Sequence, residues 1–326
     1  MAFDRANGQV VWNRTVTEEV PHEGHHRDHG FASASPVTDG EVLIASFGSR
    51  GIYGLDLAGK VLWEKRLGKM RTRNGFGEGA SPALHKDTVV VGWDHEGDDD
   101  FVVALDRRTG KELWRTPRSE PTTWSTPVVV ERPGRTEVIL SATQRIRSYE
   151  LATGKLLWEC GGMTGNVIPT PVVDADTAYL ISGFRGAALF AIPLGKNGDL
   201  TDGSSFRWRH ARGTPYVPSP LLYGGALYFG SGNDATVSRF DAATGKADYE
   251  TQRVEGVFGL YASLVGAAGR VYVVGRDGKA AVLEHGARFR VLAVNKLDDK
   301  IDASPAISGA DLFLRGHQHL YCLAER

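Results

Sequence analysis

A short phrase that recurs along the chain constrains the fold more than any other feature. Its copies are FDRANGQVVW (residues 3–12), LDLAGKVLW (55–63), LDRRTGKELW (105–114), YELATGKLLW (149–158) and FDAATGKADY (240–249). In each copy an acidic residue and a glycine turn separate two apolar runs. This order is typical of a β-hairpin, because glycine accepts a positive φ without a steric clash. The chain is therefore predicted to be rich in antiparallel strands.

A second phrase, built around Ser-Pro or a close variant, alternates with the first. Its proline, or the leucine that replaces it, recurs at intervals of 41 to 49 residues, at Pro36, Pro82, Pro127, Pro171, Pro220, Leu264 and Pro305. A period of this length is typical of a four-stranded propeller blade. We therefore expect an all-β fold, a β-propeller that spans residues 1–326 as a single domain.

The two ends of the chain complement each other. The C-terminal HLYCLAER matches the third strand of the repeat, and the N-terminal residues supply the end of a third strand and a complete fourth strand. Joining them pairs edges that would otherwise be open. We expect seven four-stranded blades closed by the N- and C-terminal strands, with an eight-bladed relative as the alternative.

Tryptophan recurs at one position of the fourth strand, at Trp12, Trp63, Trp114, Trp158 and Trp208. Large rings at equivalent positions of successive blades are expected to fill the space between the blades. We interpret them as core and leave them out of the candidate site.

The D-x-x-TG-K-x-x-W and Ser-Pro phrases resemble the PQQ-like β-propeller repeats of the quinoprotein alcohol dehydrogenase-like superfamily, which also contains outer-membrane-assembly lipoproteins. The resemblance covers nearly the whole chain and implies a propeller. It leaves the activity open, because this repeat serves dehydrogenases and assembly scaffolds alike. The quinoprotein dehydrogenases carry a vicinal disulfide beside the cofactor, whereas Cys160 and Cys322 are far apart in this sequence. We therefore do not expect PQQ as a cofactor.

Charge and hydropathy exclude several kinds of partner. The 38 lysines and arginines nearly balance the 39 aspartates and glutamates, so no overall field favours nucleic acid. No apolar run reaches the roughly 18 residues that span a bilayer, and the N-terminus lacks the basic-then-apolar order of a signal peptide. We expect no nucleic-acid partner and no membrane insertion. A periplasmic location is expected if the N-terminus is truncated, and a cytoplasmic one otherwise.

One end of the blades carries nearly all the unusual residues. The connections that precede the first strand of each blade, and those between its second and third strands, lie on the same face of an up-and-down propeller. Their side chains are predicted to converge on one funnel, and loops on a rigid scaffold are where binding sites are usually built.

The segment HEGHHRDHG (residues 22–30) places four histidines on this face, and the acidic DHEGDDD (94–100) is assigned to the same blade. Imidazole and carboxylate ligands suit zinc, manganese or iron, with calcium as an alternative. The candidate ligands are His22, His25, His26, His29, Asp94, His95 and His317. Glu23, Glu78 or Glu96 could serve as general base for a metal-bound water.

A polar loop without metal is the competing interpretation of this segment. Its letters satisfy the H-E-x-x-H pattern of helical metalloproteases, but Gly24 and the loop setting argue against a helix there. An acidic run such as DHEGDDD is also typical of a solvated loop.

Arginines recur at equivalent positions of the same face, at Arg50, Arg145, Arg185, Arg276 and Arg315, with Arg71 and Arg73 from another connection. Guanidinium groups bind carboxylate, phosphate or sulfate through two hydrogen bonds, which favours an anionic ligand. The alternative is that each arginine caps a turn or pairs with an acid of a neighbouring blade. The rings of Trp93, Trp124 and Tyr216 could stack on a carbohydrate or simply fill the channel.

Three functions follow from these residues. We favour a metal-dependent hydrolase or lyase that acts on a phosphoester, a sulfate ester or an acidic sugar, because a scaffold gives no reason for four histidines within eight residues. The alternatives are a non-catalytic propeller scaffold that binds protein or polysaccharide, and a PQQ-dependent oxidoreductase.

Overall fold

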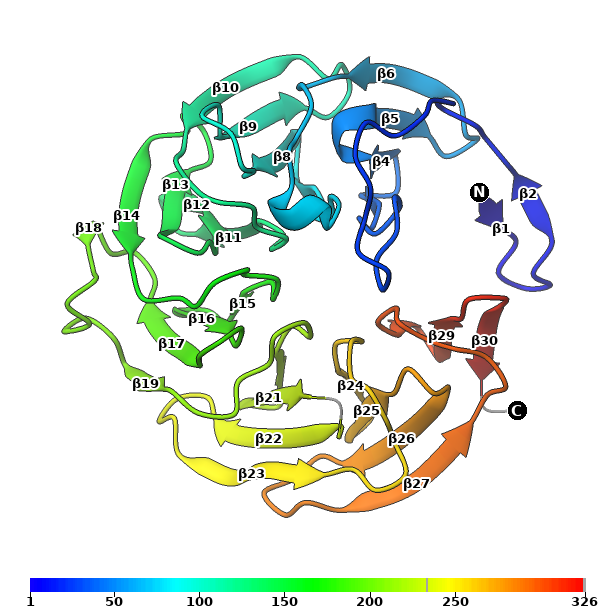
Figure 1. The fold of residues 1–326 in the computed structure, drawn as a ribbon, viewed down its shortest axis with the longest axis vertical. Helices are drawn as coiled ribbons and strands as arrows, with labels where there is room; N and C mark the ends of the chain where they lie inside the picture. The colour runs from blue at the N-terminus through cyan, green and yellow to red at the C-terminus, as the bar shows by residue number, and fades with distance from the viewer. Residues whose placement is uncertain (233, 325–326) are drawn as a thin grey trace. The chain divides into compact units, whose positions relative to one another are not determined.

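The computed structural model describes residues 1–232 and 234–324. In this part of the chain the regular structure consists of 30 strands and two 3-10 helices, η1 (Gly48–Arg50) and η2 (Arg73–Gly75). Strands that follow one another in sequence pair within the same sheet (Figure 1). The chain is an all-β propeller of seven mostly four-stranded blades, which confirms the predicted fold class.

The chain consists of two compact units. The first comprises residues 1–161 and 197–199, and the second comprises residues 162–196 and 200–326. The expectation of a single domain therefore stays a prediction. No helix of the described residues is long and apolar enough to pass through a bilayer.

The first unit contains an N-terminal hairpin and three blades. The hairpin pairs β1 (Ala2–Phe3) with β2 (Val10–Trp12). The blades are β3 (Val37–Thr38), β4 (Val42–Ser46), β5 (Ile52–Asp56) and β6 (Val61–Lys65); β7 (Ala83–His85), β8 (Thr88–Trp93), β9 (Phe101–Asp106) and β10 (Glu112–Pro117); and β11 (Val128–Arg132), β12 (Arg135–Leu140), β13 (Ile146–Glu150) and β14 (Leu156–Cys160). The short strand β18 (Gly198–Asp199) joins β14 in parallel, unlike the antiparallel pairs inside the blades.

The second unit contains three four-stranded sheets and one three-stranded sheet. They are β15 (Val172–Val173), β16 (Thr177–Ser182), β17 (Ala188–Pro193) and β19 (Trp208–His210); β20 (Leu221–Tyr223), β21 (Ala226–Ser231), β22 (Thr236–Asp241) and β23 (Ala247–Arg253); β24 (Val265–Ala267), β25 (Arg270–Val274), β26 (Lys279–Glu284) and β27 (Val291–Lys296); and β28 (Ala306–Ser308), β29 (Asp311–Arg315) and β30 (Leu320–Ala324). In the predicted closure, β2 is the fourth strand of the blade that contains β28, β29 and β30. This pairing would join the two units, and it stays a prediction.

Burial explains the strand sequences. The second blade packs against the first and third blades through its two faces, so β9 reads as a continuous apolar run in which the first five residues are buried. The outer strand β10 is half covered and alternates between less and more exposed residues. Between the first two blades a core forms that includes Val42, Ile44, Val89 and Val91.

The recurring tryptophans pack as predicted wherever both neighbours lie in one unit. Trp63 Nε1 donates to the carbonyl oxygen of Arg107 at 2.8 Å, Trp114 Nε1 to that of Leu151 at 2.7 Å, and Trp208 Nε1 to that of Ala242 at 2.8 Å. Each acceptor lies in the next blade. Trp158 differs, because its indole donates to the Glu137 carboxylate of its own sheet at 3.1 Å.

Candidate functional site

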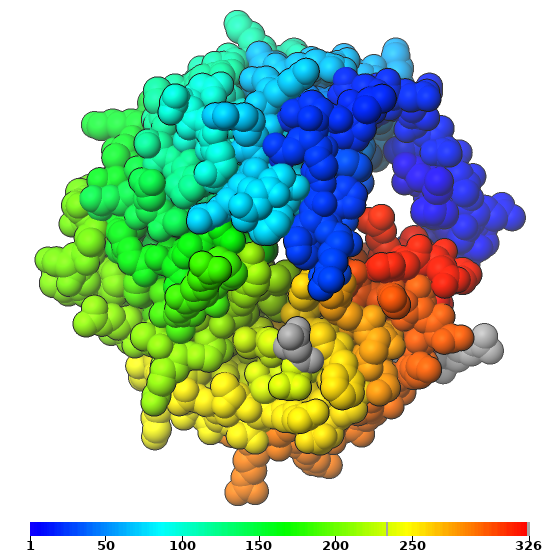
Figure 2. Space-filling model, in the orientation of Figure 1, coloured from blue at the N-terminus to red at the C-terminus, as the bar shows by residue number. Residues whose placement is uncertain are grey.

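The connection between β2 and β3, residues 13–36, contains all four histidines of HEGHHRDHG, and we call it the histidine loop. It has no regular secondary structure and lies against residues 70–78, which follow β6. In Figure 2 this contact joins the dark blue and sky-blue surfaces. His22 Nε2 is 2.7 Å from the Met70 carbonyl oxygen, and the His26 N–H donates to that of Phe76 at 3.0 Å.

Glu23, a predicted general base, fastens the histidine loop. Its carboxylate accepts the Thr72 N–H, at 3.0 Å for Oε1, and also the Thr72 hydroxyl. The Thr72 hydroxyl oxygen in turn accepts the Gly77 N–H at 2.9 Å. Both groups that Glu23 binds are neutral, and no cationic side chain pairs with this carboxylate within the described residues.

The other histidines contact their own loop and residues 76–79. His25 Nδ1 is 2.8 Å from the His26 carbonyl oxygen, and His26 Nδ1 accepts the Asp28 N–H at 3.2 Å. His29 fits between two glycines, since a Cβ on Gly77 or Gly79 would lie 2.8 or 3.0 Å from its ring nitrogens. Burial lowers the pKa of His29, and the nearby rings of His25 and His26 lower it further.

Arg50 and Glu78 form a largely buried ion pair beside the histidine loop. Arg50 Nη1 donates to Glu78 Oε1 at 3.1 Å, and Glu78 Oε2 accepts the Ser49 N–H at 2.5 Å. The carboxylate lies so close to Gly48 that a Cβ there would be 1.6 Å from Oε2. Arg50 therefore holds an acid of its own protein, as the alternative interpretation of the arginines expects.

The acidic loop DHEGDDD connects β8 to β9 and thus belongs to the second blade. From the sequence, this loop is predicted to lie in the blade that directly follows the histidine loop. That prediction is wrong, because the blade after the histidine loop is the first one, which begins with β3. Its Asp94 carboxylate accepts two hydrogen bonds from buried Arg118, at 2.6 and 3.0 Å, and one from the Thr123 hydroxyl at 2.8 Å. Burial lowers the pKa of Arg118, but the charges of Asp94, Tyr149 and Glu120 and the hydrogen bonds to Asp94 together outweigh it and raise that pKa overall.

His95 and Glu96 also face protein groups. The buried His95 ring has Nε2 at 3.2 Å from Asp99 Oδ1, and neither ring nitrogen makes a well-aligned hydrogen bond within the described residues. Glu96 Oε1 accepts the Thr122 N–H and hydroxyl, both at 3.1 Å. Glu96, like Glu23 and Glu78, thus joins two connections of the first unit.

In the described residues no group of three or more His, Cys, Asp or Glu side chains is arranged to hold a metal ion. In the second unit, His317 Nε2 is 2.8 Å from Asp302 Oδ2, and Arg276 Nε donates to Asp302 Oδ1 at 2.5 Å. The metal site stays a prediction from the sequence.

The remaining arginines have mixed surroundings. Arg145 Nη1 donates to Asp199 Oδ2 at 3.0 Å, and Arg71 Nη2 donates to the Glu96 carbonyl oxygen at 2.5 Å. Arg73 and Arg315 are exposed, and Arg185 lies beside the Phe184 ring with φ of 53°. A funnel that joins all of them would involve both units and stays a prediction.

The predicted stacking rings are held by protein contacts. Trp93 is 1% exposed and stacks on Phe101 at 5.8 Å between ring centroids. Trp124 Nε1 donates to the Gly77 carbonyl oxygen at 2.7 Å. In the second unit Tyr216 lies 4.8 Å from the Phe184 ring.

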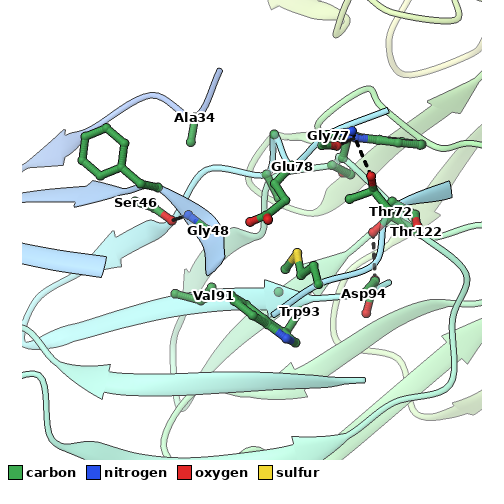
Figure 3. Close-up of a pocket in the computed structure, with 18 of the residues that line it drawn as sticks. Ala34, Ser46, Gly48, Thr72, Gly77, Glu78, Val91, Trp93, Asp94 and Thr122 are labelled. Atoms are coloured by element: carbon green, nitrogen blue, oxygen red, sulfur yellow. Dashed lines mark hydrogen bonds between the residues drawn. The ribbon is translucent and has the colours of Figure 1, made fainter. Parts of the chain in front are cut away.

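One cleft of the first unit gathers several of the predicted site residues. Those that line it are Glu23, Arg50, Glu78, Trp93, Asp94 and Trp124. Figure 3 shows the Glu78 carboxylate directed into this cleft above Val91 and Trp93 of β8. The histidine loop contributes Glu23, Gly24, Phe31 and Ala34 to its wall.

Sequence reasoning missed Ser141, which also lines the cleft. Ser141 is 2% exposed, and its hydroxyl has no hydrogen-bond partner within the described residues. A signal for it exists in the repeat, because serine recurs where the second strand of three blades ends: Ser46 and Ser182 are the last residues of β4 and β16, and Ser141 directly follows β12. Thr72 and Arg118 were also missed, since neither stands out in its own segment.

Comparison with known proteins places the chain in a family. The family model described as "Outer membrane protein assembly factor BamB" matches residues 1–77, 48–202 and 142–325. The chain belongs to the BamB family. This confirms the resemblance inferred from the repeats.

Solved structures show the same fold at low identity. BamB from Moraxella catarrhalis is 17% identical, with a TM-score of 0.69 over 89% of this chain and 84% of that chain. The computationally designed Ika8 protein is 13% identical, with a TM-score of 0.53 over 94% of this chain and 100% of its own. None of the curated proteins compared with this chain matches it.

The cleft does not fit PQQ, the quinone cofactor that the superfamily suggests. PQQ carries several carboxylates, whereas the lining already contains the acids Glu23, Glu78 and Asp94 and a single arginine, Arg50, which is paired with Glu78. Like charges within one site repel.

Proposed function

We propose that this BamB-family chain is a non-catalytic propeller that binds a partner protein through the histidine loop. One observation carries the proposal. The polar side chains of the loop are used to fasten it to residues 70–78, while its apolar residues Val20 and Phe31 remain 92% and 44% exposed. A fixed loop that presents apolar side chains is suited to docking, since little conformational freedom is lost on binding.

The family supports a protein as the partner. Its model is named for an outer membrane protein assembly factor, a description that implies contact with other proteins. The metal-dependent hydrolase, with its anionic or carbohydrate substrate, is less favoured. Its candidate bases Glu23, Glu78 and Glu96 each fasten one connection of the first unit to another, so a structural role accounts for all three.

The proposal is tested by placing a photoreactive amino acid at position 20 in the producing cells and identifying what it crosslinks. The protein so found is purified, and its Kd is measured for Val20→Ser/Phe31→Ser and for Leu57→Ser. Leu57 is 54% exposed and follows β5, at the opposite end of the blade, so it serves as the matched control. We expect the double variant to bind at least about tenfold more weakly, as interface anchors do. Equal affinities for the two variants would refute the proposal.

A further inference from the structure

The cleft of the first unit has one charge and one hydroxyl that its own protein does not satisfy. Glu23 is held only by the N–H and hydroxyl of Thr72, so no cation compensates it within the described residues. Ser141 is 2% exposed, and its hydroxyl lacks a partner there. Both residues line the cleft. A buried polar group without a partner is uncommon in proteins, and one that faces a cleft indicates a ligand.

The charges of the residues that line the cleft determine whether a cation or an anion can bind there. Three acidic residues, Glu23, Glu78 and Asp94, line the cleft, and Arg50 is the one basic residue among the described residues that line it. Arg118 compensates Asp94 from behind, and Arg50 compensates Glu78. The remaining negative charge is that of Glu23, so an anion is repelled and a cation is attracted.

The walls fit a chain of methylene groups. Phe31, Met70, Val91 and Trp93 line the cleft with apolar surface, and Trp124 is fixed there by its hydrogen bond to Gly77. A carboxylate offers about four lone-pair sites, so Glu78 can accept further donors besides Arg50 and Ser49. An alkyl stem that ends in several N–H donors matches both the walls and the unsatisfied acceptors.

We propose that the cleft binds a basic side chain, lysine or arginine, presented by the partner protein. The stem packs against Phe31 and Met70, and the cationic end is held by Glu23, Glu78 and the Ser141 hydroxyl. This inference rests on the proposed function, because it identifies the group that a protein partner inserts.

The test uses isolated side-chain probes and therefore does not need the partner. Binding of Nα-acetyl-lysine N-methylamide, its arginine counterpart, and the norleucine and glutamate counterparts is measured by ligand-observed NMR. We expect the two basic probes to bind more tightly than the norleucine and glutamate probes, and their affinity to fall as salt is added. Equal binding of norleucine and lysine, preference for glutamate, or no binding of the basic probes would overturn the inference.

Two variants with the same change of charge locate the site. Glu23→Gln keeps an oxygen for Thr72 and removes the charge, whereas Glu18→Gln changes an exposed residue of the same loop. We expect about a fivefold loss of lysine-probe affinity in the first variant and none in the second. If Glu23→Gln and Glu18→Gln reduce the lysine-probe affinity equally, the attraction comes from the overall charge of the loop, and the inference fails. If the basic probes do not bind while the affinity for the crosslinked partner still falls in Val20→Ser/Phe31→Ser, the inference fails and the proposed function stands.

Discussion

Trp63 donates its indole N–H to the Arg107 carbonyl oxygen of the next blade at 2.8 Å, and its ring lies against Gly110. A Cβ on Gly110 would come within 2.5 Å of that ring, and the residue has φ of 66°. Glycine is thus required both by the backbone conformation and by the neighbouring ring. The tryptophan of one repeat and the glycine turn of the next form one packing unit.

We predict that Gly110→Ala lowers the free energy of unfolding by about 2–4 kcal/mol, because it adds a ring clash to backbone strain. Gly134→Ala is the matched control, since Gly134 has φ of 75° and nothing within 4 Å of the added Cβ. There we expect about 1 kcal/mol from the backbone alone. Urea denaturation of both variants measures the difference. Equal losses would contradict the contribution of the ring.

Asp94→Asn is predicted to destabilise the fold by about 3–5 kcal/mol, because it leaves the Arg118 charge buried without its carboxylate. Asp98→Asn, an exposed change in the same loop, should cost less than about 0.5 kcal/mol. Thermal unfolding followed by circular dichroism compares the two. A small effect at position 94 would mean that Arg118 finds another acceptor.

The stability of the second unit should fall in mild acid because of His285. Its Nδ1 is 2.8 Å from the Tyr228 hydroxyl, and burial, followed by the charge of Arg239, lowers its pKa below 6.5. A histidine with a lowered pKa contributes its full stability above about pH 6.5 and loses it as the pH falls below that value. We expect His285→Asn, which does not titrate, to show a shallower loss of Tm between pH 7 and pH 5. Parallel curves for the two proteins would exclude His285 as the source.

Elemental analysis tests the metal site that the histidines suggest. After dialysis we expect no near-stoichiometric zinc, manganese or iron, because ring nitrogens of His22, His25 and His26 already contact protein groups. A stoichiometric metal that disappears in His25→Ala/His26→Ala/His29→Ala, with the circular dichroism spectrum unchanged, would restore the hydrolase hypothesis.

The sequence predicted the sheets well because their signals are local. The acidic residue, glycine turn and apolar runs of residues 105–114 lie within one hairpin, and β9 and β10 form there as expected. The tryptophan positions could also be predicted from the sequence, because the contact between a tryptophan and the glycine turn of the next blade recurs with the period of the repeat.

The site was harder to predict, because its contacts join loops that are far apart in the sequence. Thr72 binds Glu23 across 49 residues, and its own segment offers no pattern that marks it. Assigning DHEGDDD to the wrong blade moved Asp94 by one repeat, and the sequence did not indicate that Arg118 would neutralise it. Residue types suggested the chemistry, but the partners that satisfy each charge depend on the packing of adjacent blades.

The parallel pairing of β18 with β14 has a practical consequence for dividing the chain. Residues 197–199 belong to the first unit although residues 162–196 of the second unit precede them. A fragment that ends at Gly161 therefore loses the segment that covers the outer edge of β14. Uncovered strand edges recruit other chains, so such a fragment is expected to aggregate unless Asn197 to Asp199 are supplied by a short engineered linker.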